Sequence, residues 1–245
     1  MGGEAEMKKL YEKSNLVFAV VWIVVYCVGM FVFDEISRNI GVESSASAVF
    51  ALFISLFLFL WLKKQGKTEH FGLCKPKASA RAFLFYIPLI VITFQNVWCG
   101  VETRYDAVGT VCFIAKMLCV GCLEELIFRG FLFKAMLRDS VRWAAAVSSL
   151  TFGLGHIINL LNGSGMGVAE NLVQIFFAVL IGFMYVVIFW RGGSLWPCVI
   201  SHGVLNSLSA FSASGESIAR NAILCVLVVA YTAVLLKTLP KDKSI

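Results

Sequence analysis

Charged residues are scarce in this chain. They make up 15% of its 245 residues, whereas hydrophobic residues make up 59% and the mean hydropathy is +0.84. Soluble globular domains carry about 25% charged residues, so this composition excludes a soluble domain and indicates an integral membrane protein. Because a crossing helix needs about 20 apolar residues, the length allows about eight crossings and no separate soluble domain.

The eight cysteines lack the layout of a secreted disulfide scaffold. Seven lie within apolar runs, and Cys74 lies in a basic loop. Cys119 and Cys122 form one CxxC motif, but no second CxxC and no strand pattern accompany it, so it gives little support to a zinc or redox site. Because free cysteine is among the residues most often buried, we predict buried thiols.

The net charge of +6 is concentrated in loops and indicates topology, not nucleic-acid binding. The most basic loop runs from Lys63 to Arg81, and such loops stay in the cytoplasm. When the spans are threaded through alternate sides, sixteen Lys and Arg residues share the side of this loop and three face the other side. We therefore predict cytoplasmic termini and no nucleic-acid partner.

We expect an all-α polytopic membrane protein with a bundle of about eight transmembrane helices. No internal repeat is evident. The first apolar run lacks a small-residue cleavage site and is expected to be retained as a span. The expected spans are Leu16–Phe33, Ala46–Leu62, Ala82–Trp98, Ala107–Phe128, Trp143–Leu160, Glu170–Trp190, Ser194–Phe211 and Ala219–Leu236.

These spans divide into three regions. We expect an N-terminal three-span region at 1–106, a catalytic core of spans four to seven at 107–212, and a C-terminal span with a cytoplasmic tail at 213–245. The core is the region in which ionisable side chains enter apolar runs, so the functional residues are sought there.

Two carboxylates and a guanidinium interrupt the fourth span, in the stretch VGCLEELIFRGFLF. A charge at this depth costs roughly 2.5 to 3.5 kcal/mol, so an ionisable residue in a span is a functional candidate by default. Glu125 and Arg129 are spaced i, i+4 and are predicted to pair on one helix face. The spacing therefore predicts that Glu125 and Arg129 support the helix, while Glu124 is free for chemistry.

Two of the three histidines lie in predicted spans. His156 follows Phe152 by four residues and His202 precedes Asn206 by four, so each pair shares a helix face. A lone buried histidine is more often a hydrogen-bonded core residue. Two histidines, an amide and a glutamate pair on three spans favour a convergent site instead. His70 lies in the basic loop and is expected to be solvated.

This set of side chains is suited to the hydrolysis of a peptide bond. A carboxylate in a low-dielectric cavity can exchange a proton near neutral pH, which makes Glu124 a candidate general base or acid. His156 is a candidate for sharing the attacking water, and His202 with Asn206 offers donors to an oxyanion. A serine nucleophile is not indicated, because Ser164 lacks the GxSG context of serine intramembrane proteases.

Three motifs occur in order on separate spans: Glu124-Glu125-x-x-x-Arg129, Phe152-x-x-x-His156 and His202-x-x-x-Asn206. Together they resemble the CPBP family of intramembrane endopeptidases (CAAX protease and bacteriocin-processing, also called Abi). The resemblance covers about 108–211. It implies that Glu124 activates water with His156 as its partner and that His202 and Asn206 form the oxyanion site. It also implies supporting roles for Glu125, Arg129 and Phe152.

The resemblance further implies a substrate class and a location. Eukaryotic relatives remove the last three residues of prenylated CAAX proteins, and bacterial relatives are linked to peptide-signal maturation and bacteriocin immunity. We expect an enzyme that hydrolyses membrane-associated peptides or proteins in a prokaryotic plasma membrane, with its active site opening toward the cytoplasm. The predicted boundaries place His156 farther from the cytoplasmic face than Glu124 or His202, so span five is expected to begin later or to tilt.

Enzymes of this family have been described both as zinc proteases and as metal-free glutamate proteases. Zinc catalysis needs three protein ligands and an open position, and Glu124, His156 and His202 would supply the ligands. No HExxH motif is present, and a carboxylate that binds the metal cannot also be the base. We therefore favour a mechanism without a cofactor and keep zinc as the alternative.

Two interpretations without proteolysis are the alternatives. A bacteriocin-immunity or scaffold protein would keep the family fold and act by binding, but it has little reason to bury glutamates beside histidines. A proton-coupled transporter would use Glu124, His156 and Lys116 as a relay. Such a transporter is expected to have broken helices in two related halves, which the sequence does not indicate.

Overall fold

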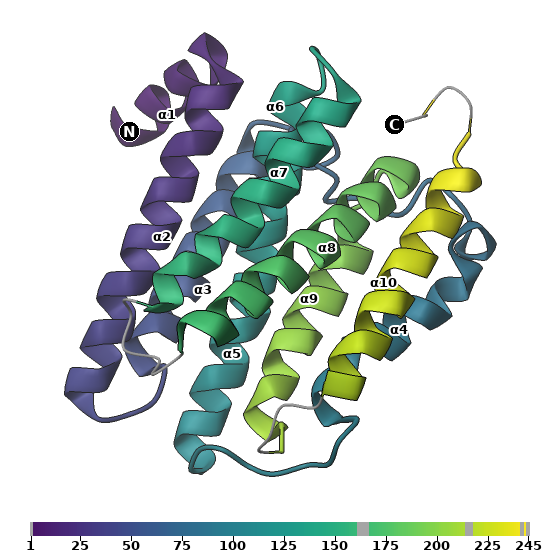
Figure 1. The fold of residues 1–245 in the computed structure, drawn as a ribbon. Helices are drawn as coiled ribbons and strands as arrows, with labels where there is room; N and C mark the ends of the chain where they lie inside the picture. Colours follow the sequence, from purple (N-terminus) through teal and green to yellow (C-terminus); the bar gives the residue numbers. More distant parts are fainter. Residues whose placement is uncertain (1, 161–166, 214–217, 241–242, 244–245) are drawn as a thin grey trace.

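The chain forms an all-α bundle (Figure 1). The computed structural model describes residues 2–160, 167–213, 218–240 and 243. Within these ranges the only β-type pairing is an isolated bridge between Val101 and Ser212. The glycine-rich turn with Ser164 lies outside the described residues.

Most helices lie at the positions of the expected spans. The first residues of α2 and the last residues of α10 lie at the same end of the bundle (Figure 1). The bounds of the helices are α1 (Gly2–Lys13), α2 (Asn15–Ile40), α3 (Ser45–Lys64), η1 (Ala80–Tyr86), α4 (Ile87–Thr93), η2 (Gln95–Val97), α5 (Ala107–Glu124), η3 (Glu125–Phe133), α6 (Lys134–Met136), α7 (Val141–Gly155), η4 (His156–Leu160), α8 (Val168–Gly192), α9 (Trp196–Leu208), η5 (Ser209–Phe211) and α10 (Ile218–Lys237).

Six helical stretches in the described part of the chain are long and apolar enough to cross a membrane. They correspond to the expected spans one, two, three, five, six and eight, so the prediction of a multi-pass membrane protein is confirmed. The six stretches are Asn15–Ile40, Ser45–Lys64, Ala80–Val97, Val141–Leu160, Val168–Gly192 and Arg220–Lys237. Neither α5 nor α9, which carry most of the candidate site, is among them, and α9 has only 13 residues.

The third expected span, Ala82–Trp98, is not one continuous helix. It is divided into η1, α4 and η2, and the first break occurs where Leu84, Phe85 and Tyr86 have φ angles of 51°, 53° and 60°. This left-handed region interrupts a right-handed helix. A new helix then begins with Pro88 in its first turn, where the missing N–H of proline removes no intrahelical hydrogen bond.

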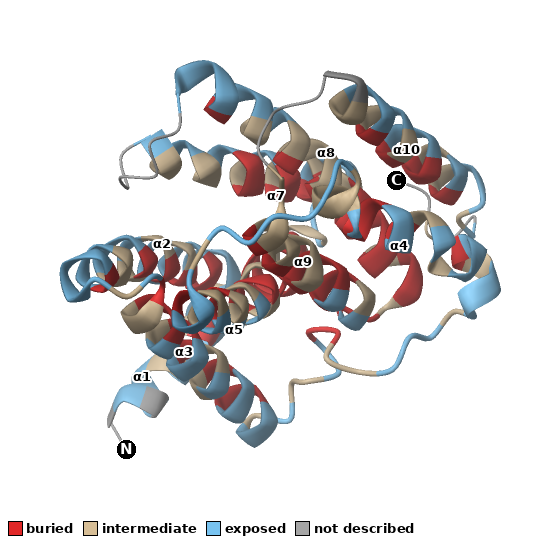
Figure 2. Cartoon of the chain, turned by 90° about the horizontal axis from the view of Figure 1, so that it is seen from below, coloured by how far each residue is buried: buried red, intermediate tan, exposed pale blue. Residues whose placement is uncertain are grey.

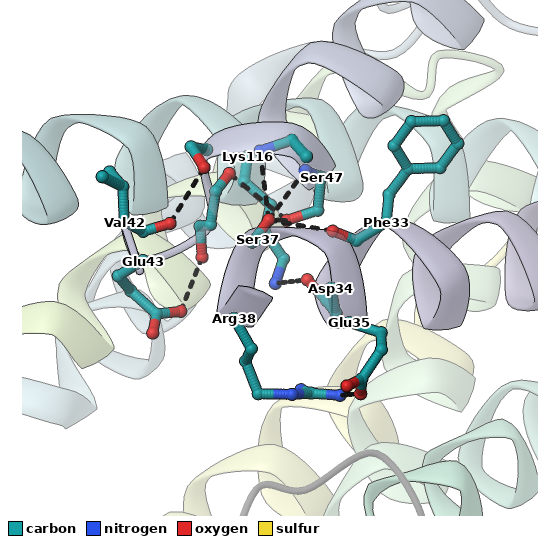
Figure 3. Close-up of polar contacts among 12 residues, drawn as sticks. Phe33, Asp34, Glu35, Ser37, Arg38, Val42, Glu43, Ser47 and Lys116 are labelled. Carbon is teal, nitrogen blue, oxygen red and sulfur yellow. Dashed lines mark hydrogen bonds and ion pairs between the residues drawn. The ribbon is translucent and has the colours of Figure 1, made fainter. Parts of the chain in front are cut away.

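Polar contacts fix the turn between α2 and α3 and link α2 to α5 (Figure 3). Gly41 ends α2 in a left-handed conformation with φ 80°, which glycine adopts without steric cost. The Ser37 hydroxyl accepts a hydrogen bond from the backbone N–H of Ser47 at 3.2 Å. Nearby, Lys116 Nζ on α5 forms a largely buried ion pair with Asp34 Oδ1 on α2 at 2.6 Å. These contacts set the position of α2 along α5.

Helices α5 and α9 pack closely because two glycines meet at their crossing. A Cβ atom on Gly121 would lie 2.5 Å from the backbone nitrogen of Gly203, closer than real Cβ contacts. Gly203 follows His202 directly, and Gly121 lies one helical turn before Glu124 and Glu125. The close approach therefore brings both carboxylates to the histidine.

The segment η3 is a π-helix of nine residues, all of them buried. A π-helix has i to i+5 hydrogen bonds, and short π segments in proteins are often found at functional sites. The Ser148 hydroxyl on α7 donates a 2.8 Å hydrogen bond to the Phe128 carbonyl inside this segment. Viewed along the bundle, buried residues gather around α9 and exposed residues cover the outer faces (Figure 2). The π-helical segment, which begins directly after Glu124, therefore lies in the buried core next to the candidate site.

Candidate active site

One cavity of about 720 Å³ brings together all four predicted catalytic residues. Glu124 is the last residue of α5, His156 is the first residue of η4, and His202 and Asn206 lie on α9. All four side chains line the cavity. The predicted convergence of three spans is therefore present in the fold, while the chemical role of each residue stays a prediction.

The two carboxylate oxygens of Glu124 face different partners. Oε1 accepts a hydrogen bond from the Tyr26 hydroxyl at 2.7 Å. Oε2 lies 3.4 Å from Nε2 of His202. The Glu124 side chain is 13% exposed, whereas the Glu125 side chain is fully buried. Adjacent carboxylates thus occupy different environments, because Glu124 faces the cavity and Glu125 faces the protein interior.

The predicted pair between Glu125 and Arg129 is formed behind the cavity. Arg129 Nη1 lies 3.0 Å from Glu125 Oε1, and both side chains are fully buried. The same Glu125 oxygen lies 2.9 Å from Nδ1 of His202. Glu125 Oε2 and the Arg129 atoms Nε and Nη2 have no hydrogen-bond partner among the described residues. The pair therefore supports His202 as well as the helix.

Phe152 connects the cation to both histidines. The guanidinium carbon of Arg129 lies 4.2 Å from the centroid of the Phe152 ring, a cation–π contact. The same ring meets His156 edge to face with centroids 5.3 Å apart and His202 with centroids 5.6 Å apart. The predicted supporting residue Phe152 thus fixes the spacing of the two imidazoles.

His156 lies within the expected fifth span, in the apolar helical stretch Val141–Leu160, but the helix changes type at this residue. Helix α7 begins at Val141, two residues before the expected start, and ends at Gly155, so His156 opens the 3₁₀ turn η4. The expectation that span five begins later is therefore wrong. Its Nδ1 lies 3.2 Å from the Phe152 carbonyl. The buried Asn171 side chain on α8 donates to the His156 carbonyl at 2.8 Å and anchors this turn.

Asn206 lines the cavity one helical turn beyond His202. Within the described part of the chain its side chain makes no hydrogen bond, whereas its backbone carbonyl accepts one from Ser209 at 2.7 Å. The amide N–H groups are therefore available to a ligand in the cavity.

Two tyrosines at the site were not predicted from the sequence. Tyr26 on α2 binds Glu124. The Tyr185 ring on α8 lies 5.7 Å from the His202 ring, and its hydroxyl is 3.0 Å from the Ser201 hydroxyl. Each is an isolated tyrosine in an apolar run with no polar partner at i±4, so no sequence pattern marks either residue.

A preformed zinc site is not present among the described residues. No group of three or more His, Cys, Asp or Glu side chains there is close enough to hold a metal ion. Glu124 and His202 are neighbours, but His156 is not close enough to both of them to complete a group of three ligands. The set Glu124, His156 and His202 therefore does not fit zinc in this arrangement, and we derive no step through a metal.

The other candidates lie outside the cavity. His70 is exposed in the basic loop, and partial burial followed by the charges of Lys134 and Lys67 lowers its pKa below the usual range. All eight cysteines, including Cys119 and Cys122, are free thiols. Neither His70 nor a cysteine lines the cavity beside the candidate residues, except Cys27 on α2.

The cavity reaches the protein surface at the end of the bundle opposite the start of α2. Arg104, in the loop before α5, and Glu170, at the start of α8, both line it and are exposed. Asp34, near the end of α2, lines it as well. On the other side of Glu124 the nine buried residues of η3 fill the bundle. The active-site cavity therefore extends away from the end at which α2 begins.

Residues 107–208 match the model of the family described as Type II CAAX prenyl endopeptidase Rce1-like. This segment belongs to the Rce1-like family. The match confirms the resemblance to the CAAX protease family and contains all three motifs. No curated protein and no solved structure matches the chain. The Rce1-like segment supplies the candidate residues on α5, η4 and α9, whereas Tyr26 comes from outside it.

Proposed function

We propose that the protein is an intramembrane endopeptidase that hydrolyses peptide bonds of membrane-associated peptides. The observation that carries this proposal is the convergence of Glu124, His156, His202 and Asn206 on one cavity within a segment of a protease family. A pocket lined by polar groups inside a membrane bundle suits a polar substrate backbone rather than a lipid alone.

Glu124 is the proposed general base. It removes a proton from a water molecule as the water oxygen attacks the scissile carbonyl. Its position supports this role, because it is the carboxylate that faces the cavity, while Glu125 is engaged by Arg129 and His202. The proton then passes to the leaving amine, either directly from Glu124 or through His156. Water is consumed, and the products are a carboxylate and an amine.

His202 and Asn206 are proposed to hold the oxyanion that forms during this attack. Both lie one turn apart on α9 and line the same wall of the cavity. The contact with Glu125 orients the His202 ring so that Nε2 faces Glu124 and the cavity. The Asn206 amide has no competing partner among the described residues. Donors fixed before the reaction stabilise developing charge without reorganisation.

We propose that this chemistry proceeds without a metal. Two observations support it: Glu124, His156 and His202 do not form a group close enough to hold a metal ion, and Glu124 is the proposed base. Zinc held by Glu124, His156 and His202 would require the side chains to rearrange. The alternative of a non-proteolytic immunity or scaffold protein gains no support from a cavity on which Glu124, His156, His202 and Asn206 converge.

The substrate class is proposed to be a peptide anchored in the membrane, either prenylated at a CAAX sequence or of the signal or bacteriocin type. Two exposed apolar side chains line the cavity on α2 and α8, Phe31 and Val173, each 38% exposed. In a bilayer they would face acyl chains. A substrate held by a lipid group or a hydrophobic helix can therefore approach from the membrane.

The orientation of the cavity is a separate proposal. If the termini are cytoplasmic, as the distribution of basic residues predicts, the surface end of the cavity at Arg104 and Glu170 faces away from the cytoplasm. We expected both cytoplasmic termini and an active site that opens toward the cytoplasm. Because the cavity reaches the surface at the end opposite the start of α2, both expectations cannot hold for this cavity. We give priority to the charge rule, because it rests on sixteen basic residues against three.

Two assays test the proposed function. Membrane-associated peptides are compared by mass spectrometry in cells that express the wild type or Glu124→Gln. Purified protein in detergent is also offered an internally quenched peptide that ends in a farnesylated CAAX sequence, with the same peptide lacking farnesyl beside it. We expect the wild type to cleave at least one substrate and Glu124→Gln to lose more than about a hundredfold in rate, since the general base is removed.

A matched control is Glu12→Gln, which removes an exposed carboxylate on α1 far from the cavity. It is expected to retain wild-type activity. If Glu124→Gln accumulates normally, shows the wild-type melting temperature and still cleaves at the wild-type rate, the protease proposal is wrong.

A further inference from the structure

The shortest polar contact to the proposed base among the described residues comes from a helix outside the Rce1-like segment. Tyr26, near the middle of α2, donates its hydroxyl hydrogen to Glu124 Oε1 at 2.7 Å. Tyr26 is 7% exposed and lines the cavity. A hydrogen bond to an ionised carboxylate is short and about twice as strong as one between neutral groups.

We propose that Tyr26 is a positioning residue of the active site, which holds one carboxylate oxygen of Glu124 so that the other faces His202 and the cavity. This inference rests on the proposed function, in which Glu124 is the base. Without the Tyr26 contact, the Glu124 side chain can rotate about its terminal bond, because that torsion is broad. With the contact, Oε1 is fixed and Oε2 remains the oxygen available to water.

The position of Tyr26 is set by a second polar contact along the same two helices. Helices α2 and α5 run antiparallel (Figure 1), and two polar contacts join them: Tyr26 with Glu124, and Asp34 with Lys116. All four residues line the cavity. The outermost pair is the 2.6 Å ion pair between Lys116 and Asp34 (Figure 3). It lies about 12 Å from the first pair, at about 1.5 Å of helix rise per residue.

The ion pair therefore fixes the height of α2 along α5. A shift of one residue in this register would move the Tyr26 hydroxyl by about 1.5 Å and break its bond to Glu124. Near the middle of α2, the Tyr26 hydroxyl holds the carboxylate of Glu124, the proposed base. Closer to the surface end of the cavity, the ion pair between Lys116 and Asp34 holds the two helices together. Helix α2 is thus part of the active site although it lies outside the family segment.

The experiment compares two tyrosine-to-phenylalanine variants of the full chain in detergent. Tyr26→Phe removes the hydroxyl that binds Glu124. Tyr231→Phe removes a buried hydroxyl on α10 that donates to the Phe83 carbonyl at 2.9 Å and does not line the cavity. On the farnesylated quenched peptide, we expect Tyr26→Phe to lower kcat about ten- to a hundredfold with KM within about twofold. We expect Tyr231→Phe to keep the wild-type kcat.

A conservative replacement separates positioning from packing. p-Aminophenylalanine at position 26 retains the ring and an N–H donor at the same place, and we expect it to recover most of the kcat lost in Tyr26→Phe. Equal kcat for Tyr26→Phe and the wild type, or no recovery with the amino analogue, would overturn the inference.

A substrate-independent measurement covers the case in which the quenched peptide is not cleaved. Thermal unfolding is followed for Tyr26→Phe, Glu124→Gln and the double variant, and we expect the effects of the single changes to be non-additive, because the two groups share one hydrogen bond. Additive effects would overturn the inference. If the wild type cleaves peptides and Glu124→Gln does not, while Tyr26→Phe equals the wild type, only the role of Tyr26 fails and the proposed function stands.

Discussion

Glu125 and His202, which are 77 residues apart in the sequence, are joined by a 2.9 Å hydrogen bond between Oε1 and Nδ1. The i, i+4 spacing predicts only a supporting role for Glu125, through Arg129. The contact with His202 adds a second task, because it orients the imidazole that faces Glu124. The Glu125 carboxylate therefore both stabilises the helix, through Arg129, and orients His202.

A Glu125→Gln variant tests this double role. The amide cannot pair as an anion with Arg129 and leaves a buried cation without its partner, which costs about 3 to 5 kcal/mol of folding free energy. We expect a lower melting temperature and, at temperatures where the variant is folded, a lower kcat, because His202 is less well oriented. Thermal unfolding and peptide cleavage measure the two effects. A wild-type melting temperature with wild-type kcat would refute both.

The Arg129→Ala variant tests how much the buried pair of Arg129 and Glu125 stabilises the fold. It leaves the fully buried Glu125 without its cation, and we expect a loss of about 3 to 5 kcal/mol in the free energy of unfolding. Arg104→Ala is the control, since Arg104 is exposed at the end of the cavity. Its stability is expected to stay within about 0.5 kcal/mol of the wild type. Equal stability of both variants would contradict the importance of the buried pair.

Asn206→Ala tests the oxyanion site. The Asn206 side chain has no hydrogen bond to lose among the described residues, so we expect unchanged stability together with a drop in kcat of about a hundred- to a thousandfold. Ser207→Ala is the neighbouring control, because its hydroxyl donates to the Gly203 carbonyl and does not line the cavity. Steady-state kinetics with the quenched peptide distinguish the two. A wild-type kcat in Asn206→Ala would remove Asn206 from the mechanism.

Cysteine labelling tests the orientation. Cys99 is exposed in the loop between η2 and α5, at the end of the bundle where the cavity reaches the surface. Lys75, in the basic loop, is exposed at the opposite end. In intact cells, a membrane-impermeant maleimide is expected to label Cys99 in the wild type. It is expected to leave Lys75→Cys in a Cys99→Ser background unlabelled. The reverse pattern would place the termini outside and the cavity toward the cytoplasm.

A chelator tests the metal question. We expect purified protein to keep its activity after treatment with 1,10-phenanthroline and dialysis, because no described group of side chains forms a preassembled metal site. Measurement of bound zinc by mass spectrometry accompanies the assay. Loss of activity with recovery on addition of zinc would replace the metal-free mechanism by one in which Glu124, His156 and His202 bind the ion.

Much of the fold could be predicted because it depends on hydrophobic length. The expected run Leu16–Phe33 lies within α2, and Glu170–Trp190 lies within α8, since membrane helices are defined by long apolar stretches. The break in the third span could not be predicted. Pro88 marks the start of α4, but nothing in the sequence signals the left-handed residues before it.

Some contacts of the candidate site could likewise be predicted from the sequence, and others could not. Glu125 and Arg129 could be paired from their spacing, because i, i+4 contacts are local. The partners of Glu124 could not, because Tyr26 and His202 reach it through the packing of α2 and α9 against α5. The end of α7 at Gly155 is also set by packing: Asn171 on α8 holds the turn that follows. Local spacing fixes pairs within a helix, whereas contacts between helices depend on tertiary structure.

The π-helical segment after Glu124 has a consequence for the tolerance of this chain to length changes. Each wide turn accommodates a residue that an α-helix would not. Deleting a single residue between Leu126 and Phe133 would allow the segment to tighten into ordinary α geometry. The tightened segment then absorbs the deletion, so α5 and α6 keep nearly the same rotation about the helix axis. A further insertion in this stretch adds about 100° of rotation instead, and it is expected to turn the acidic pair away from α9 even when the polypeptide still inserts and folds.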